Sequence, residues 1–494
     1  MLPTGLRDTK KKQTKLKGFL GLYLPENRAE GQLADGYNLS AGEAPYVRVR
    51  APRARFYFYG KTGPAESWIT AGDVLCGSER GQFQLEQTDA GFLWQVHTDT
   101  ARSAGGSISL SGEGLSTFFK QYARVTGMAG QALVFPSVPD KDLEMGPTKS
   151  VLYSAPVADG HGEDAPTPTA TTLDNVVLYG GCAFDNNLYC FGRQWDKQGV
   201  SVPMMFVSAL GQPTVFTPDG TDAGAFYFPV VTDSDFTAIC AYKGSVYFFT
   251  GHEMYQIYGT VPSNYTAQKI HNVGCIGPDG LCELDGVLYF TDGTSLYAFS
   301  GGTPGAVSGA LGNLGAQDAC LCPGEEMLYL LCRQAQGDRL YTYRPKNSLY
   351  YREQTDGMLR LFSYRGRPAA AAGGVLVSLC GGMDAPALQA LAGEGAVPFR
   401  LETGDLLLYE SPFVLRHVLR RVLLRLSVTG TAHLSVHAAL DGGPWRTLYS
   451  APILRSGTVE LPLRLPPCSR LRLAVSGAGD VLFMDLAKEV EQIG

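Results

Sequence analysis

The residues of this chain that could bind a metal ion are few. His433 and His437 lie four residues apart, a spacing that brings two ligands together on a helix. Here they fall in an alternating pattern typical of a strand, where they would lie about 13 Å apart, too far to share one ion. His161-Gly162-Glu163-Asp164 lies in the polar stretch 159–172, which reads as a projecting, solvated loop, with a weak calcium site as the alternative. We therefore expect no metal ion and no cofactor.

Other chemistry has no signature in the sequence. The chain lacks a phosphate-binding GxxxxGK[ST] loop, a GxSxG nucleophile elbow, an HExxH zinc motif and a GxGxxG dinucleotide-binding motif. Because no catalytic residue can be assigned, we expect the chain not to be an enzyme.

The composition favours an all-β protein. The 494 residues include 60 glycines, 29 prolines and 25 tyrosines, which favour turns and strands, and only 18% of residues are charged. The net charge of −6 argues against a protein that coats DNA through a basic surface. The length predicts two or three domains, or one large repeat architecture.

Eleven cysteines, none in a CxxC pair, are expected to be free thiols that act as small buried hydrophobic residues. Cys320 and Cys322 are two residues apart and should point to one face of a strand.

The sequence shows no signal peptide near its N-terminus, and no apolar segment reaches the roughly 18 residues of a membrane span. We therefore expect the protein to fold in a reducing cytoplasm.

Two stretches, Lys243–Gly259 and Asp285–Gly301, repeat each other 42 residues apart without a gap. Each copy reads as a turn, a strand, a tight turn and a second strand. Looser copies centred on Tyr189, Tyr329 and Val377 bring the spacings to between 40 and 58 residues. Such spacing is typical of the four-stranded blades of a β-propeller.

The rest of the chain is less regular. Residues 45–180 predict two further blades, with strands at 56–59, 92–96 and 133–135, which gives six or seven blades in all. Helices are expected only at 115–125 and 486–493.

The last hundred residues alternate apolar and polar residues in short strands separated by glycine turns, which predicts an antiparallel β-sandwich. We therefore predict an N-terminal arm and lead-in at 1–40, a six- or seven-bladed β-propeller at 41–395 and a C-terminal sandwich at 396–494. Within the sandwich, Leu440–Trp445 resembles the Asp-box turn of sialidases, in which Asp and Gly shape a hairpin and Trp packs beneath it. That resemblance implies a structural role.

The basic N-terminal arm is the one candidate partner-binding segment. It carries five lysines, Lys10, Lys11, Lys12, Lys15 and Lys17. Such an arm is either a solvated tail or a strap that lies along a neighbouring subunit.

Two stretches resemble a known family. One is Gly36–Ser40, followed by Ala44–Pro52. The other is Tyr255–Thr260, followed by Pro262–Tyr265, Lys269-Ile270, Gly274 and Gly277. These stretches are similar to tail accessory propellers of short-tailed phages, the packaged-DNA stabilisation or tail nozzle type.

The resemblance implies a structural virion protein of the phage tail, made in the host cytoplasm. It implies a ring of six copies that contacts portal, adaptor and other tail proteins, retains packaged DNA and lets it pass without sequence-specific binding. Two alternatives remain. One is a tail component that binds a receptor or glycan, and the other is a propeller glycoside hydrolase, which needs paired carboxylates converging on the central channel.

Overall fold

The computed structural model of the chain is built almost wholly from β-strands. It describes residues 11–15, 19–57, 67–71, 74–79, 82–87, 92–97, 124–128, 131–135, 150–156, 169–259, 261, 264–364, 366–372, 375–383, 389–407, 416–463 and 465–493. In that part of the chain the helical segments are two short 3₁₀ turns, Ser308–Leu311 and Pro345–Asn347, and no helix is long and apolar enough to span a membrane. The prediction of an all-β protein is confirmed.

Most of the described strands form seven small antiparallel sheets of four or five strands each. The first three sheets contain β6 (Ser67–Ala71), β7 (Val74–Glu79), β8 (Gln82–Gln87) and β9 (Phe92–His97); β10 (Arg124–Met128), β11 (Gln131–Phe135), β12 (Ser150–Pro156) and β13 (Thr169–Leu173); and β14 (Val176–Phe184), β15 (Asn187–Trp195), β16 (Ser201–Val207) and β17 (Phe226–Pro229). The next three contain β18 (Phe236–Tyr242), β19 (Ser245–Thr250), β20 (Met254–Tyr258) and β21 (Thr266–His271); β22 (Leu281–Leu284), β23 (Val287–Thr291), β24 (Leu296–Phe299) and β25 (Gly305–Ala306); and β26 (Asp318–Pro323), β27 (Leu328–Arg333), β28 (Arg339–Arg344) and β29 (Leu349–Glu353). The seventh contains β30 (Met358–Tyr364), β31 (Arg367–Ala372), β32 (Val375–Ser378) and β33 (Gln389–Ala390), together with β5 (Arg55–Tyr57) from earlier in the chain.

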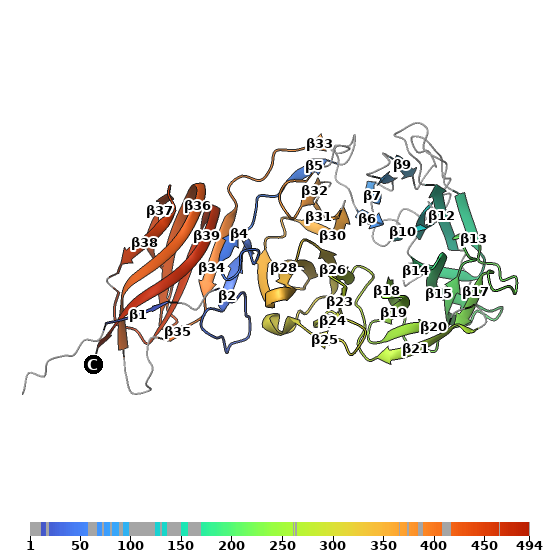
Figure 1. The fold of residues 1–494 in the computed structure, drawn as a ribbon, viewed down its shortest axis with the longest axis horizontal. Helices are drawn as coiled ribbons and strands as arrows, with labels where there is room; N and C mark the ends of the chain where they lie inside the picture. The colour runs from blue at the N-terminus through green and yellow to red at the C-terminus, as the bar shows by residue number, and fades with distance from the viewer. Residues whose placement is uncertain are drawn as a thin grey trace, which may run out of the picture.

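The first strands of these sheets lie around one axis (Figure 1). β6 packs against β10, β10 against β14, and β14 against β18. The series continues from β22 to β26, from β26 to β30, and from β30 back to β6. The last sheet takes a strand from ahead of the first one, because β5 pairs with β32.

The repeated hairpins of the sequence are present in the structure. Lys243 and Gly244 link β18 to β19 with φ of 45° and 75°, and Asp285 and Gly286 link β22 to β23 with φ of 51° and 72°. Two consecutive residues with positive φ form the tight turn that matches the twist of antiparallel strands. The predicted turn–strand–turn–strand repeat is therefore confirmed.

A larger sheet contains ten of the described strands, drawn from both ends of the chain. They are β1 (Lys11–Lys15), β2 (Leu33–Tyr37), β3 (Leu39–Ser40), β4 (Val47–Val49), β34 (Pro398–Thr403), β35 (Leu406–Leu407), β36 (Arg416–Leu440), β37 (Arg446–Ile453), β38 (Gly457–Pro462) and β39 (Arg470–Ile493). The long strands β36 and β39 pair with each other through most of their length. The core of this sheet contains residues from both termini, among them Leu39, Val49, Leu424 and Phe483.

The observed division of the chain differs from the predicted segments at 1–40, 41–395 and 396–494. β4 at 47–49 still belongs to the ten-stranded sheet, and the first strand that joins a small sheet is β5. The cause lies in the core, because Val47 and Val49 are buried among residues of the C-terminal strands. The N-terminal segment is thus part of the C-terminal sheet.

The expected helix at 486–493 is wrong. These residues form the end of β39, which pairs with β36 on one edge and with β1 on the other. Their alanine, lysine and glutamate content favours a helix locally, but backbone pairing on both edges stabilises a strand. Of the other expected helix, residues 115–123 lie outside the described residues and Arg124 begins β10.

The polar stretch 159–172 is only partly described. Its last residues belong to strand β13, so they are not the loop that composition predicts, and the pairing of β13 with β12 is the reason. His161, Glu163 and Asp164 lie outside the described residues.

The described cysteines are free, as predicted. Cys320 and Cys322 share one face of β26 and pack in the same apolar cluster. Burial raises the pKa of each thiol to about 12. These residues therefore act as small core side chains.

Candidate functional site

The seven small sheets form one assembly, and the ten-stranded sheet forms the other. Two chain segments that lie side by side join these two assemblies. One segment, 50–54, runs from the ten-stranded sheet into β5, and the other, 391–397, returns from β33 to β34. The backbone N–H groups of Leu391 and Glu394 donate to the carbonyls of Arg55 and Arg53 at 2.8 and 3.2 Å. Both crossings between the assemblies thus meet at one place.

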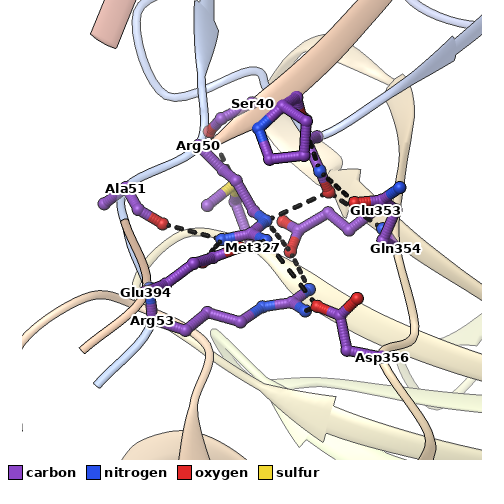
Figure 2. A network of polar contacts seen from close by, with 11 residues as sticks. Ser40, Arg50, Ala51, Arg53, Met327, Glu353, Gln354, Asp356 and Glu394 are labelled. Atoms are coloured by element: carbon purple, nitrogen blue, oxygen red, sulfur yellow. Dashed lines mark hydrogen bonds and ion pairs between the residues drawn. The ribbon is translucent and has the colours of Figure 1, made fainter. Parts of the chain in front are cut away.

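Buried arginines of the first segment bind carboxylates from three directions (Figure 2). Arg50 donates from Nη1 and Nη2 to the two carboxylate oxygens of Glu394 at 2.6 and 2.7 Å. Arg53 donates to Glu353 at 2.8 Å and to Asp356 at 2.7 Å. The side chains of Arg50, Arg53 and Glu353 are each 3% exposed or less, so the Arg53–Glu353 contact is desolvated on both sides, whereas Glu394 and Asp356 are 22% and 49% exposed.

Asn38 links this network to both assemblies. It is fully buried at φ 58°, and its Nδ2 donates to Gln354 Oε1 at 2.8 Å and to the Pro398 carbonyl at 2.7 Å. Its Oδ1 accepts from Arg50 Nε at 3.1 Å and from the Gln354 N–H at 2.9 Å. One amide therefore connects a small sheet, the crossing segment and the ten-stranded sheet.

The surroundings of Arg50 and Glu394 favour the ionised forms of both side chains. Burial alone would raise the pKa of Glu394, but the hydrogen bond from Arg50, the Arg53 N–H and both guanidinium charges outweigh it and lower that pKa. For Arg50, burial opposes the charged form, while the Glu394 hydrogen bond and nearby carboxylates raise its pKa. The Arg50–Glu394 pair is therefore ionised near neutral pH and holds the two crossing segments together.

A polar groove of about 460 Å³ opens beside the network. Its lining comes from β2, from the turn between β27 and β28, and from the end of β29: Tyr37, Gln336–Arg339 and Arg352–Asp356. Arg352 at its edge is paired with Asp35 at 2.8 Å. The groove can hold a polar group, and two of the carboxylates along it, Glu353 and Asp356, are already paired with Arg53.

A second charged cluster lies where three small sheets meet. Asp279 precedes β22, Asp318 begins β26 and Arg360 lies in β30. Arg360 is ion-paired with Asp279, and Arg333 Nε lies 3.6 Å from Asp318. Partial desolvation, followed by the charge of the Asp279 carboxylate, raises the pKa of Asp318. Sequence reasoning missed this cluster because its members are far apart in the chain.

No protein-family model matches the chain, and no curated protein matches its sequence. Solved structures do resemble its fold. An exo-β-1,3-galactanase from Phanerochaete chrysosporium is 8% identical, with 78% of this chain and 99% of that chain covered, at a TM-score of 0.28. The extracellular domain of a hybrid two-component system from B. thetaiotaomicron is 9% identical, covering 89% and 64%, at a TM-score of 0.40. The WD40 domain of SCAP from fission yeast is 8% identical, covering 85% and 96%, at 0.25.

The prediction that the chain is not an enzyme is contradicted by these likenesses. Glycoside hydrolases, including the galactanase and a β-xylosidase, are among the structures with a similar fold. Missing local motifs are poor grounds for excluding catalysis, since a catalytic site can assemble from residues that are far apart in the chain. At 7–11% identity the likeness is one of fold, and it assigns no substrate to this chain.

The five predicted arm lysines are only partly described. Lys11, Lys12 and Lys15 lie in β1, which pairs with the end of β39, so that Lys11 faces Glu491 and Lys15 faces Ala487 in the register. Lys10 and Lys17 lie outside the described residues. Binding of this arm to a partner stays a prediction.

The histidine pair and the hairpin that resembles an Asp-box both lie in the ten-stranded sheet. His433 and His437 lie in β36, and the described residues contain no group of three or more potential metal ligands. At the hairpin after β36, Asp441 and Gly442 have φ of 49° and 76°, and the Asp441 carboxylate accepts the N–H groups of Ser469 and Arg470 at 2.8 Å each. Asp and Gly thus shape the turn, as the Asp-box resemblance implies.

Trp445 differs from that resemblance. It is 37% exposed and lies against the guanidinium groups of Arg400 and Arg472, each 5.4 Å from the ring centre. The indole is therefore a surface group on the ten-stranded sheet, where the Asp-box would place it beneath the hairpin.

Proposed function

We propose that the seven small sheets are the blades of one propeller. Two features support this reading: their first strands follow one another around an axis, and β5 completes the last sheet from the opposite end of the segment. We also propose that the ten-stranded sheet folds over itself as a sandwich. β36 pairs with β38 along its first half and with β37 along its second half, which suits a strand that turns from one layer to another.

We further propose that the chain is a structural protein of a tailed-phage virion, forming a ring in the tail or head–tail connector. The observation that carries the proposal is the position of Asn38 and Arg50. Both belong to the stretch that resembles phage tail propellers, and both lie in the buried network at the crossing between the assemblies. A subunit that contacts its neighbours through one assembly and lines a channel with the other needs a rigid connection between the two assemblies.

The charge of the chain suits a channel component. With a net charge of −6, a wall built from it repels the phosphate backbone, so that DNA slides instead of being held. We propose that the partners are further copies of the chain in a six-membered ring, together with portal, adaptor and other tail proteins.

Assembly tests the proposal. The purified full chain is examined by light scattering and electron microscopy, alone and after mixing with a portal–adaptor complex. Rings, or a complex with the portal–adaptor, are expected. A chain that stays monomeric and does not bind the complex contradicts the proposal.

A lysine variant addresses the arm in the same assay. Replacing Lys10, Lys11, Lys12, Lys15 and Lys17 by Ala should weaken attachment, because five charges that could meet an acidic partner are removed. The matched control replaces five exposed basic residues elsewhere by Ala: Lys197, Lys346, Arg446, Arg455 and Arg470. Equal attachment of both variants contradicts a role for the arm.

A further inference from the structure

One face of the ten-stranded sheet carries an ordered set of polar side chains. Alternate residues of β34, β36 and β39, such as Leu401, Leu434 and Leu473, point into the apolar core. The residues between them therefore point to the opposite, outer face. Because directly paired residues of antiparallel strands share a face, the register determines which of these outer residues are neighbours.

The outer face has one row of hydrogen-bonding groups across five strands. Each residue of the row is the direct partner of the next: Tyr37 on β2, Arg400 on β34, Ser476 on β39, Ser435 on β36 and Ser450 on β37. Ser435 and Ser450 lie 2.9 Å apart through their hydroxyl oxygens. The row is thus a line of hydroxyl and guanidinium groups running across the strands.

A second row lies beside the first. It runs from Asp35 through Glu402 and Ala474 to His437 and Thr447. His437 contacts the hydroxyls of Thr447 and Ser476, both at 3.1 Å. Burial and the charge of Arg400 lower the pKa of His437, so the imidazole is neutral at neutral pH and can donate and accept hydrogen bonds.

Trp445 stands at the edge of these rows as a fixed aromatic platform. Arg400 and Arg472 lie against the indole, and both are ion-paired with the nearly buried Glu402. This arrangement holds the ring in place, yet 37% of the residue stays exposed. A fixed aromatic surface beside a row of hydroxyl, guanidinium and imidazole groups matches a ligand with apolar C–H faces and many hydroxyls.

We propose that this face, defined by Trp445, the Tyr37–Ser450 row and His437, is an oligosaccharide-binding site. The indole would stack on the C–H face of one sugar ring, while the polar row would bind the hydroxyls of adjoining rings. A protein partner would call for an apolar centre, which this hydroxyl-rich face does not provide. A nucleic acid would call for a larger positive excess, and Glu402 offsets one of the two arginines. The site does not depend on the proposed virion function.

Calorimetry on the full chain tests the site. The probes are linear hexasaccharides of glucose, xylose and galacturonic acid. At least one is expected to bind, with affinity reduced about fivefold or more in Trp445→Ala and partly retained in Trp445→Phe, because loss of stacking weakens the complex by roughly 1 kcal/mol or more. Leu454→Ala, which removes another exposed apolar side chain (67% exposed), is the matched control and should bind as the unmodified chain does.

Three outcomes overturn the proposal. One is the failure of all three probes to bind the unmodified chain at millimolar concentration. Another is equal binding by Trp445→Ala and the unmodified chain when both show the same melting temperature. The third is a change in self-association in Trp445→Ala with no change in sugar binding, which would make the face a protein interface. The first two outcomes do not bear on ring assembly, and the third would favour contacts between copies of the chain, so the two proposals fail separately.

Discussion

Arg50 and Glu394 meet in a two-point contact, with Nη1 and Nη2 of the guanidinium 2.6 and 2.7 Å from the two carboxylate oxygens. They are 344 residues apart in the chain and lie on the two segments that cross between the sheet assemblies. The contact is fixed further by Asn38, whose Oδ1 accepts from Arg50 Nε. The pair therefore ties the outgoing chain to the returning chain.

Removing the charge of Glu394 should destabilise the protein. Glu394→Gln leaves the buried Arg50 guanidinium without its two-point partner, and we expect a loss of about 2–3 kcal/mol in the free energy of unfolding. Urea denaturation of the purified variant measures it. Glu325→Gln, at an exposed turn position, is the control and should change stability little. Similar losses in the two variants would contradict a stabilising role for this contact.

The same contact should make stability depend on acid pH. The pKa of Glu394 in the folded chain lies below its ordinary value of 4.5, so its contribution is complete above that value and disappears as the pH falls through the folded pKa. The difference in unfolding free energy between the unmodified chain and Glu394→Gln should therefore be constant near neutral pH and shrink on acidification. A difference that grows as the pH falls would show that the sign is wrong.

Losing the side-chain hydrogen bonds of Asn38 should lower the stability of the protein more than the strain of its positive φ does. Asn38→Ala removes four hydrogen bonds from a fully buried position, for an expected loss of about 2–4 kcal/mol. Asn38→Gly removes the same bonds but tolerates φ 58°, so it should be less destabilised than Asn38→Ala by about 1 kcal/mol. Melting curves of both variants give the comparison. If glycine restored full stability, the side-chain bonds would be unimportant.

Two glycines should respond to alanine very differently. Gly286 has φ 72°, and a Cβ there would meet nothing within 4 Å, so Gly286→Ala costs only backbone strain, about 1 kcal/mol. A Cβ at Gly274 would lie 2.2 Å from the Thr250 carbonyl oxygen and from the His252 nitrogen, both backbone atoms. Gly274→Ala should therefore destabilise the chain several-fold more in urea denaturation. Equal midpoints for the two variants would contradict the close packing at Gly274.

The hairpin repeat could be predicted from the sequence because its cause is local. Asp285-Gly286 and Lys243-Gly244 adopt positive φ, and alternating apolar residues on either side mark the strands, so a few neighbouring residues determine each unit. The all-β class follows from the same kind of local information, as do the free cysteines, of which six of the ten described are buried.

The sites and the domain boundary depend on contacts between residues far apart in the chain. Alternation alone cannot show that Val47 and Val49 complete the core of C-terminal strands, or that the end of β39 is paired on both edges. The expected helix at 486–493 failed for that reason, since pairing outweighed local propensity.

The sequence by itself therefore determined the turns, the strand pattern and the class of fold. Only the tertiary structure brought Arg50 to Glu394, Asp279 and Asp318 together, and Trp445 onto Arg400 and Arg472. The physical reason is that a turn is encoded by adjacent φ preferences, whereas an ion pair or a stacked ring requires two distant segments to be placed by the packing of everything between them.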